Sequence, residues 1–335
     1  MQKKLGAKFG LPWLYLKNET KAPTGTTKDR MAAVSLAYLY ESGVRVFCTS
    51  STGNSSTAYA NFISNFPDFS MCLFTAEAFK DRVQYTPGKQ IKHFVLRDAS
   101  FVEAFNYSSV FARKNGFTTE RGFFNLGRRE GLKLAWFEAS EQISRPLDWY
   151  VQAISSAMGV YGTYKGAKEL QELNHTDRLP HLLCVQQESC SPMASAWREG
   201  SETIQSHHII HNPSGIAKAI LRGDPTRAYP LTRKIVIESD GDIESVSEQE
   251  IRDAQAMVKE LEGISICFSA STAIAGLIKQ VRNGNFPCHE TVLVNLTGSD
   301  RATDDTNQDD NIHWLSRSGD GWKPDDPDKE GNLVF

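Results

Sequence analysis

Residues 44–65 read VRVFCTSSTGNSSTAYANFISN, and this stretch indicates the fold class. Its first part, VRVFCTS (44–50), is short, apolar and rich in β-branched and aromatic side chains, which is typical of a buried strand. After a turn that contains a glycine, residues 54–65 have the pattern of a helix. A strand that leads directly into a helix is the repeating unit of parallel α/β proteins.

The same unit recurs along the chain. The runs SMCLFT (70–75) and IKHFVL (91–96) are predicted strands, and predicted helices follow them at 76–84 and 100–115. Further strands are predicted at 147–155, 179–187, 233–239 (RKIVIES) and 291–298, and further helices at 128–142, 163–175 and 246–263. This alternation predicts a doubly wound α/β fold with mostly parallel sheets, in which ligands bind at the carboxyl ends of strands.

Composition narrows the possible functions. The 335 residues are enough for one large or two medium domains, and the formal net charge of −3 gives no reason to expect a nucleic-acid or anionic-membrane partner. No apolar run approaches membrane-spanning length. The six cysteines form no CxxC pair, so they predict reduced thiols, a cytoplasmic location and no metal site. Residues 301–335 are rich in Asp, Gly and Pro, which predicts a surface tail.

Three predicted strand-to-helix loops carry small and hydroxylated residues. They are TSSTGNSS (49–56), SSAMGVYGTYKG (155–166) and NLTGSD (295–300). Backbone N–H groups at a helix start, together with nearby hydroxyls, suit a carboxylate or phosphate ligand. Each loop taken alone is also compatible with an ordinary turn or helix cap.

A fourth segment, PTGTTKDRM (23–31), places Lys28 among small hydroxylated residues just before a predicted helix. A lysine that reacts with a carbonyl must be neutral, and such a lysine needs a particular setting. A solvated lysine at a helix start is the simpler interpretation of this segment alone.

Four collinear motifs favour a reactive Lys28 over a solvated one. The segments KNETKAPTGTTKDR (17–30), STGN (51–54) and RREGLKLAWFE (128–138), and the pair Thr297-Gly298 after a strand, resemble the fold-type-II family of pyridoxal-phosphate enzymes. Within that family they are most similar to the threonine synthases, from about residue 13 to residue 300. Members usually carry an N-terminal segment with a Thr-Pro-Leu turn, whereas this sequence opens at KLGAKFGLPWLYLKNE (4–19), so the segment is either absent or truncated.

The resemblance implies a tryptophan synthase β-like architecture: two doubly wound α/β domains with pyridoxal 5′-phosphate between them. It places a smaller, mobile domain at 30–145 and a larger, cofactor-binding domain at 1–29 and 146–300, followed by the tail at 301–335. It also implies a homodimer and a small amino-acid substrate.

Residue roles follow from the same resemblance. Lys28 forms the Schiff base with the cofactor and then moves protons as a general base and acid. Asn54 hydrogen-bonds the cofactor's 3′ oxygen, and Thr297 faces its pyridine nitrogen. The cofactor phosphate is wrapped by Gly159, Val160, Tyr161, Gly162 and Thr163. The substrate's α-carboxylate is received by Ser51, Thr52, Gly53 and Ser55.

The predicted substrate pocket departs from the threonine synthase pattern. Arg128 and Asn125 match family positions that bind the substrate phosphate, and a further basic residue aligns with either Lys80 or Arg82. The family's Asn-Ser pair, however, has become Gly122-Phe123. The leading hypothesis is a lyase that eliminates phosphate from O-phosphohomoserine and adds water to give threonine. The alternatives are a β-replacement or deaminating relative, similar to cysteate synthase or threonine dehydratase, and a cofactor-binding protein without turnover.

Overall fold

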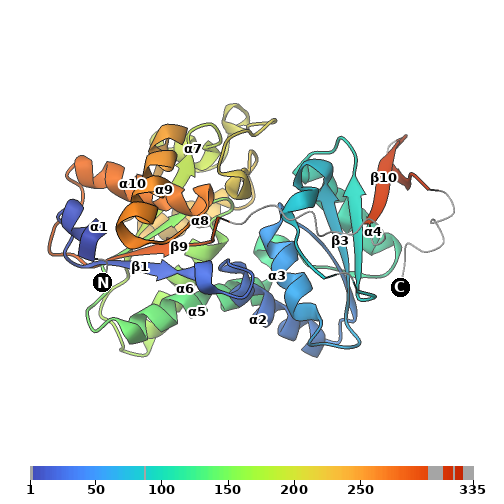
Figure 1. Cartoon of the computed structure of the whole chain (residues 1–335), viewed down its shortest axis with the longest axis horizontal. Coiled ribbons are helices and arrows are strands. Elements are labelled where there is room, and N and C mark those ends of the chain that lie inside the picture. Colours follow the sequence, from blue (N-terminus) through green and yellow to red (C-terminus); the bar gives the residue numbers. More distant parts are fainter. Residues whose placement is uncertain (1–2, 87, 301–311, 320, 327–335) are drawn as a thin grey trace. The chain divides into compact units, whose positions relative to one another are not determined.

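The computed structural model describes residues 3–86, 88–300, 312–319 and 321–326, which divide into two compact units (Figure 1). Unit 1 comprises residues 1–27 and 132–301, and unit 2 comprises residues 28–131 and 302–335. The boundaries at 27 and 131 lie earlier than the predicted ones at 29 and 145. The second differs because helix α5 (Leu126–Gln142) is divided between the units.

Unit 1 contains a five-stranded sheet with the order β1-β9-β6-β7-β8, in which every neighbouring pair is parallel. Its strands are β1 (Leu14–Asn18), β6 (Trp149–Ala153), β7 (His181–Gln187), β8 (Asp242–Val246) and β9 (Val292–Leu296). Because β9 lies between β1 and β6 and is parallel to both, the segments that follow these strands leave the sheet at one common edge.

Helices connect the strands of unit 1. They are α1 (Lys3–Lys8), η1 (Glu19–Lys21), α6 (Met158–Glu172), α7 (Pro192–Arg198), η4 (Ser206–His208), η5 (Lys218–Ile220), α8 (Tyr229–Glu238), α9 (Glu248–Glu262) and α10 (Phe268–Arg282). Helix α9 shows how the sequence sets its own ends. The Ser247 hydroxyl accepts a hydrogen bond from the Glu250 N–H, and the Glu250 carboxylate accepts one from the Ser247 N–H. At the other end, Gly263 ends the helix in the left-handed conformation at φ 69°.

Unit 2 contains a six-stranded sheet with the order β11-β10-β4-β3-β2-β5. All its pairs are parallel except β10–β11. Its elements are α2 (Lys28–Glu41), β2 (Val46–Ser50), α3 (Asn54–Ile63), β3 (Ser70–Ala76), η2 (Glu77–Arg82), β4 (Ile91–Leu96), α4 (Phe101–Lys114), β5 (Thr118–Thr119), η3 (Gly122–Phe124), β10 (Ile312–Ser318) and β11 (Gly321–Pro324). Buried Phe74, Phe94 and Phe111 form an aromatic core, with the first two rings stacked 4.7 Å apart.

Two predicted elements are wrong. The run RKIVIES, predicted as a strand, lies in helix α8. There Tyr229, Thr232, Ile235 and Val236 are buried at helical spacing while Ile237 is exposed, since a short apolar run does not distinguish a buried strand from a helix. The predicted helix at 76–84 is instead the short 3₁₀ helix η2.

The predicted tail also differs from the structure. Residues 301–311, 320 and 327–335 lie outside the described residues, but β10 and β11 are regular strands. Strand β10 pairs with β4 in parallel, with Ile312 opposite His93 and Leu315 opposite Leu96. Buried Ile312 and Leu315 give this segment its place in the sheet, although Asp, Gly and Pro dominate the residues around it. Among the described residues, no helix is both long and apolar enough to cross a membrane.

Candidate active site

Lys28 is the first residue of helix α2, directly after the loop that contains PTGTT. The Thr27 N–H donates to the Thr297 carbonyl at 3.0 Å, and Thr26 forms a β-bridge with Gly298. These contacts fix the backbone immediately before the lysine. Burial of the amine, and secondarily the positive charge of Arg128, lower the pKa of Lys28 to about 8. A much larger fraction of this amine is therefore neutral near pH 7 than of an ordinary lysine.

The STGN loop connects β2 to helix α3 in unit 2. Gly53 adopts φ 124°, and a Cβ at this position would lie 2.8 Å from the Arg82 backbone oxygen, so only glycine fits. The Ser51 hydroxyl accepts the N–H groups of Gly53 and Ser56, both at 3.1 Å. Ser51, predicted to receive a substrate carboxylate, is thus already part of the loop's own hydrogen bonding. Asn54 and Ser55 open helix α3, whose N-terminus is suited to bind an anion.

The two alternative basic residues lie in different surroundings. The Arg82 Nε donates to the Thr52 carbonyl at 2.8 Å and so supports the loop. The Lys80 ammonium lies 3.1 Å from Asp81 and 5.9 Å from the centre of the Trp314 ring. Of the two, Arg82 is the one that the structure joins to the predicted substrate loop.

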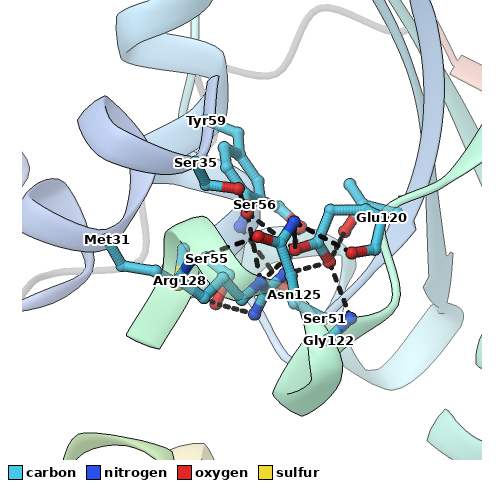
Figure 2. A network of polar contacts seen from close by, with 11 residues as sticks. Met31, Ser35, Ser51, Ser55, Ser56, Tyr59, Glu120, Gly122, Asn125 and Arg128 are labelled. Atoms are coloured by element: carbon cyan, nitrogen blue, oxygen red, sulfur yellow. Dashed lines mark hydrogen bonds and ion pairs between the residues drawn. The ribbon is translucent and has the colours of Figure 1, made fainter. Parts of the chain in front are cut away.

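Arg128 lies in a buried polar network rather than facing open solvent (Figure 2). Its Nη2 donates to Glu120 Oε2 at 2.6 Å, and its Nε also contacts the same carboxylate. Its Nη1 donates to the Ser55 hydroxyl at 3.3 Å. Only 6% of the Arg128 side chain and 2% of the Glu120 side chain are exposed, so this ion pair is removed from water. The network differs from the predicted role, in which Arg128 binds a substrate phosphate, because Glu120 already supplies the opposite charge.

The rest of the network supports the Glu120 carboxylate. Tyr59 donates to Oε1 at 2.8 Å, Asn125 Nδ2 donates to Oε1 at 2.9 Å, and the Gly122 N–H donates to Oε2 at 3.1 Å. The side-chain oxygen of Asn125, a residue predicted to bind substrate, also accepts a hydrogen bond from the backbone N–H of Arg128 at 3.1 Å. Its side chain is therefore occupied in holding these two charged residues together.

The charges explain the protonation states. Burial raises the pKa of Tyr59, so the phenol stays protonated and can donate. Burial, the largest single effect, would lower the pKa of Arg128, but the charges of and hydrogen bonds to Glu120 and Tyr59 together outweigh it and the pKa is raised. The sequence reasoning missed both Glu120 and Tyr59, because a single Glu and a single Tyr carry no motif. The pair Arg121-Gly122, which adopts φ values of 74° and 55°, marks the turn that brings Glu120 back to Arg128.

The residues predicted to hold the cofactor phosphate lie in unit 1. They were expected in a loop, but Gly159 to Thr163 form the first turns of helix α6, which begins at Met158. Ala157 adopts the left-handed conformation at φ 56°, and the Tyr161 N–H bonds its carbonyl at 2.9 Å. The N–H groups of the first helical residues have no partner within the helix. They remain suited to bind an anion, now as a helix N-terminus rather than as a loop.

Gly159 lies against the side-chain amide of Gln152. A Cβ there would lie 2.4 Å from Gln152 Nε2, in a cluster where the Tyr150 hydroxyl donates to Gln152 Oε1 at 2.6 Å. Asn295 Nδ2 donates to the Tyr150 hydroxyl at 2.8 Å. Burial raises the pKa of Tyr150 to about 12. The side chains of this cluster belong to β6 and β9, near their carboxyl ends.

Thr297 directly follows β9 and Met158 begins the helix after β6, so both lie beyond the carboxyl ends of neighbouring parallel strands. Several buried polar atoms of unit 1 have no hydrogen-bond partner within the described part of the chain, and two of them, Thr27 Oγ1 and Asn295 Oδ1, belong to the residue before Lys28 and to β9. Buried polar atoms are normally paired, so these two are consistent with a ligand site at this sheet edge.

One cluster outside these regions has the composition of a metal site. His207 Nε2 and His208 Nε2 lie 3.0 and 2.9 Å from Glu199 Oε2. The Gln205 N–H donates to His208 Nδ1 at 2.9 Å, which leaves the proton of a neutral His208 ring on Nε2, pointing at the carboxylate. His208 thus has no lone pair for a metal in this arrangement, and the cluster is a hydrogen-bonded group.

Comparisons with known proteins agree with this geometry. Residues 2–298 match the family described as pyridoxal-phosphate dependent enzyme. The chain is 30% identical over 307 residues to the threonine synthase of Methanosarcina acetivorans, which covers 88% of this chain and 72% of that protein. It is 27% identical over 300 residues to the cysteate synthase of the same organism, covering 82% and 68%.

Among solved structures, maize serine racemase is similar with a TM-score of 0.72 at 18% identity, covering 90% of this chain and 87% of that one. The two mostly parallel sheets are those of a tryptophan synthase β-like fold. The lysine segment before α2 and the helix N-terminus after β6 agree with the family match. The chain therefore belongs to the fold-type-II family of pyridoxal-phosphate-dependent enzymes.

Proposed function

We propose that the chain is a carbon–oxygen lyase, which removes an oxygen substituent from the side chain of an amino acid. The observation that carries this proposal is the setting of Lys28, whose pKa is lowered to about 8. An amine with this pKa can take a proton from the substrate's Cα near neutral pH and return it to a leaving oxygen or a later carbon.

The cofactor fits the residues present. When bound, pyridoxal phosphate stabilises the negative charge left at Cα after the proton is removed. Lys28 would hold it covalently, and the N-terminus of α6, with Gly159 at its start, would hold its phosphate. The unpaired buried Asn295 Oδ1 and Thr27 Oγ1 are acceptors that a ligand or its water shell would satisfy. Asn54 and Thr297 keep the roles that the resemblance implies as part of this proposal.

Two substrate classes are compatible with a lyase of this family. Sequence similarity to threonine synthase supports O-phosphohomoserine, from which the reaction releases phosphate and adds water to give threonine. The Glu120–Arg128 ion pair instead supports a serine- or threonine-type amino acid, because Glu120 already neutralises Arg128 and accepts from its Nε and Nη2. In that case the proton leaves Cα, the Cβ–O bond breaks and water departs, and hydrolysis then gives a 2-oxo acid and ammonia.

A product assay distinguishes the two classes. We expect the holoenzyme to form 2-oxo acid from L-serine or L-threonine with a kcat/KM at least about tenfold above that for phosphate release from O-phosphohomoserine, since one charge-assisted contact contributes roughly that factor. Both products are measured on one enzyme preparation. The reverse preference would favour the threonine synthase reaction, and the absence of any amino-acid turnover would contradict the lyase proposal itself.

The pKa of Lys28 makes a separate prediction about pH. Covalent attachment of the cofactor to the apo protein requires the neutral amine, so its rate should rise roughly tenfold per pH unit below pH 7 and level off above about pH 9. The rate is followed by the absorbance of the yellow product. Nα-acetyl-lysine, whose only amine is the ε-amine, corrects for titration of the cofactor when mixed with the same cofactor solutions, and its rate should continue to rise to about pH 10. A protein rate that rises in parallel with that of Nα-acetyl-lysine would show that Lys28 is not perturbed.

The homodimer and the cytoplasmic location, which were inferred from the sequence alone, stay predictions.

A further inference from the structure

We propose that Glu120 is a specificity-determining residue: its carboxylate occupies Arg128 in the way that a substrate anion would, and so restricts the site to amino acids with an uncharged side-chain oxygen. This proposal rests on the proposed lyase function and names its substrate class. It concerns unit 2 alone, since Glu120, Arg128, Lys28 and the STGN loop all belong to that unit.

The donors around Glu120 have the composition of an anion site. A guanidinium, the phenol of Tyr59, the amide of Asn125 and the Gly122 N–H converge on the two carboxylate oxygens at 2.6 to 3.1 Å. Thr49 Oγ1 adds a longer contact at 3.4 Å. Figure 2 shows the side chains of Tyr59, Asn125 and Arg128 around the Glu120 carboxylate. Planar, two-point contact with an oxyanion is the interaction for which Arg is best suited. Here the oxyanion is a residue of the chain itself.

The position of Arg128 connects this site to the chemistry. Its charge acts on Lys28, and its Nη1 donates to Ser55 in the loop predicted to bind substrate. Ser55 Oγ also lies 4.0 Å from the sulfur of Met31, one helical turn beyond Lys28 on α2. The anion that pairs with Arg128 therefore determines the electrostatic environment of Lys28 and of the predicted substrate loop.

A phosphorylated side chain would meet this arrangement unfavourably. With Glu120 in place, the buried pair has no net charge, and an incoming phosphate would approach a carboxylate of the same sign. To take over the Nε and Nη2 groups of Arg128, it would have to displace Glu120 from them and leave that carboxylate buried without a counter-ion. A hydroxyl substituent brings no charge and requires no such displacement.

The test is Glu120→Gln, which preserves the shape of the side chain and removes its charge. In the holoenzyme, whose cofactor phosphate site is filled, we expect this variant to bind inorganic phosphate at least about tenfold more tightly than the wild type, by calorimetry. Its preference for O-phospho-L-serine over L-serine, as a ratio of kcat/KM, should rise by roughly 10- to 100-fold. The matched control is Glu77→Gln, which neutralises an exposed carboxylate in the same unit that pairs with Arg97.

A second variant keeps the test decisive if Glu120→Gln does not fold. Glu120→Asp retains the negative charge, so we expect it to exclude phosphate as the wild type does. Wild-type holoenzyme that binds phosphate as tightly as Glu120→Gln, or an aspartate variant that gains phosphate binding, would overturn the proposal. Calorimetry decides this point even if neither protein turns over any amino acid, an outcome that would instead contradict the proposed lyase function.

Discussion

Replacing Lys28 with alanine should abolish covalent attachment of the cofactor and lower kcat/KM by roughly 10²- to 10⁴-fold, the range that a positioned general base and acid contributes. The effect should exceed that of any other single substitution in unit 2, because the lowered pKa of Lys28 is what allows its amine to be both nucleophile and proton carrier near pH 7. Borohydride reduction followed by peptide mass analysis measures the attachment directly.

The matched control is Lys21→Ala, which removes an exposed lysine from the segment that precedes the same loop. It should leave both attachment and kcat/KM close to wild type. Should the reduced cofactor be found on any lysine other than Lys28 in the wild type, the assignment of the reactive amine is wrong.

Arg128→Ala should lower the free energy of unfolding by about 3–5 kcal/mol, because it leaves the buried Glu120 carboxylate without its counter-ion. The double variant Arg128→Met/Glu120→Leu should recover only part of that loss, since an apolar pair has no charge to desolvate but deprives the donors of Tyr59, Asn125 and Gly122 of the carboxylate. Urea unfolding followed by circular dichroism gives both values.

An exposed ion pair provides the comparison. Lys234 and Glu238 lie one turn apart on α8 at 3.7 Å, with the lysine side chain 70% exposed. Lys234→Ala should change the free energy of unfolding by less than about 1 kcal/mol. If Arg128→Ala lowered the free energy of unfolding as little as this control, the Glu120–Arg128 pair would not be the buried, mutually dependent ion pair that its hydrogen bonds indicate.

The sequence predicted the local features of this protein well. The strand–helix order of residues 44–65 and the caps of α9 depend on near neighbours, and those signals are written in contiguous residues. Lys28 and the STGN loop were recognisable for the same reason. The Glu120–Arg128 pair was not, because its meaning depends on Tyr59 and Ser55, which reach it from another helix. A charged residue looks alike in the sequence whether it is solvated or buried against a partner.

The errors in the fold have the same origin. RKIVIES fits a strand until its neighbours show which face is buried, and β10 resembles a loop until β4 is available to pair with it. In each case a long-range contact outweighs the local preference. The first turn of α6 was predicted as loop because its two glycines allow close backbone approach to an anion, whereas in the structure Gly159 lies in the helix against the amide of Gln152.

The strand pairings also constrain how the chain is made. Strand β1 is synthesised long before its partner β9 at Val292–Leu296, and β4 long before its partner β10 at Ile312–Ser318. Until then, both β1 and β4 present unpaired edges to other nascent chains, and such edges promote aggregation. Neither sheet can be completed co-translationally from its early strands, so a stop codon upstream of residue 312 would yield a polypeptide in which β4 keeps an open edge.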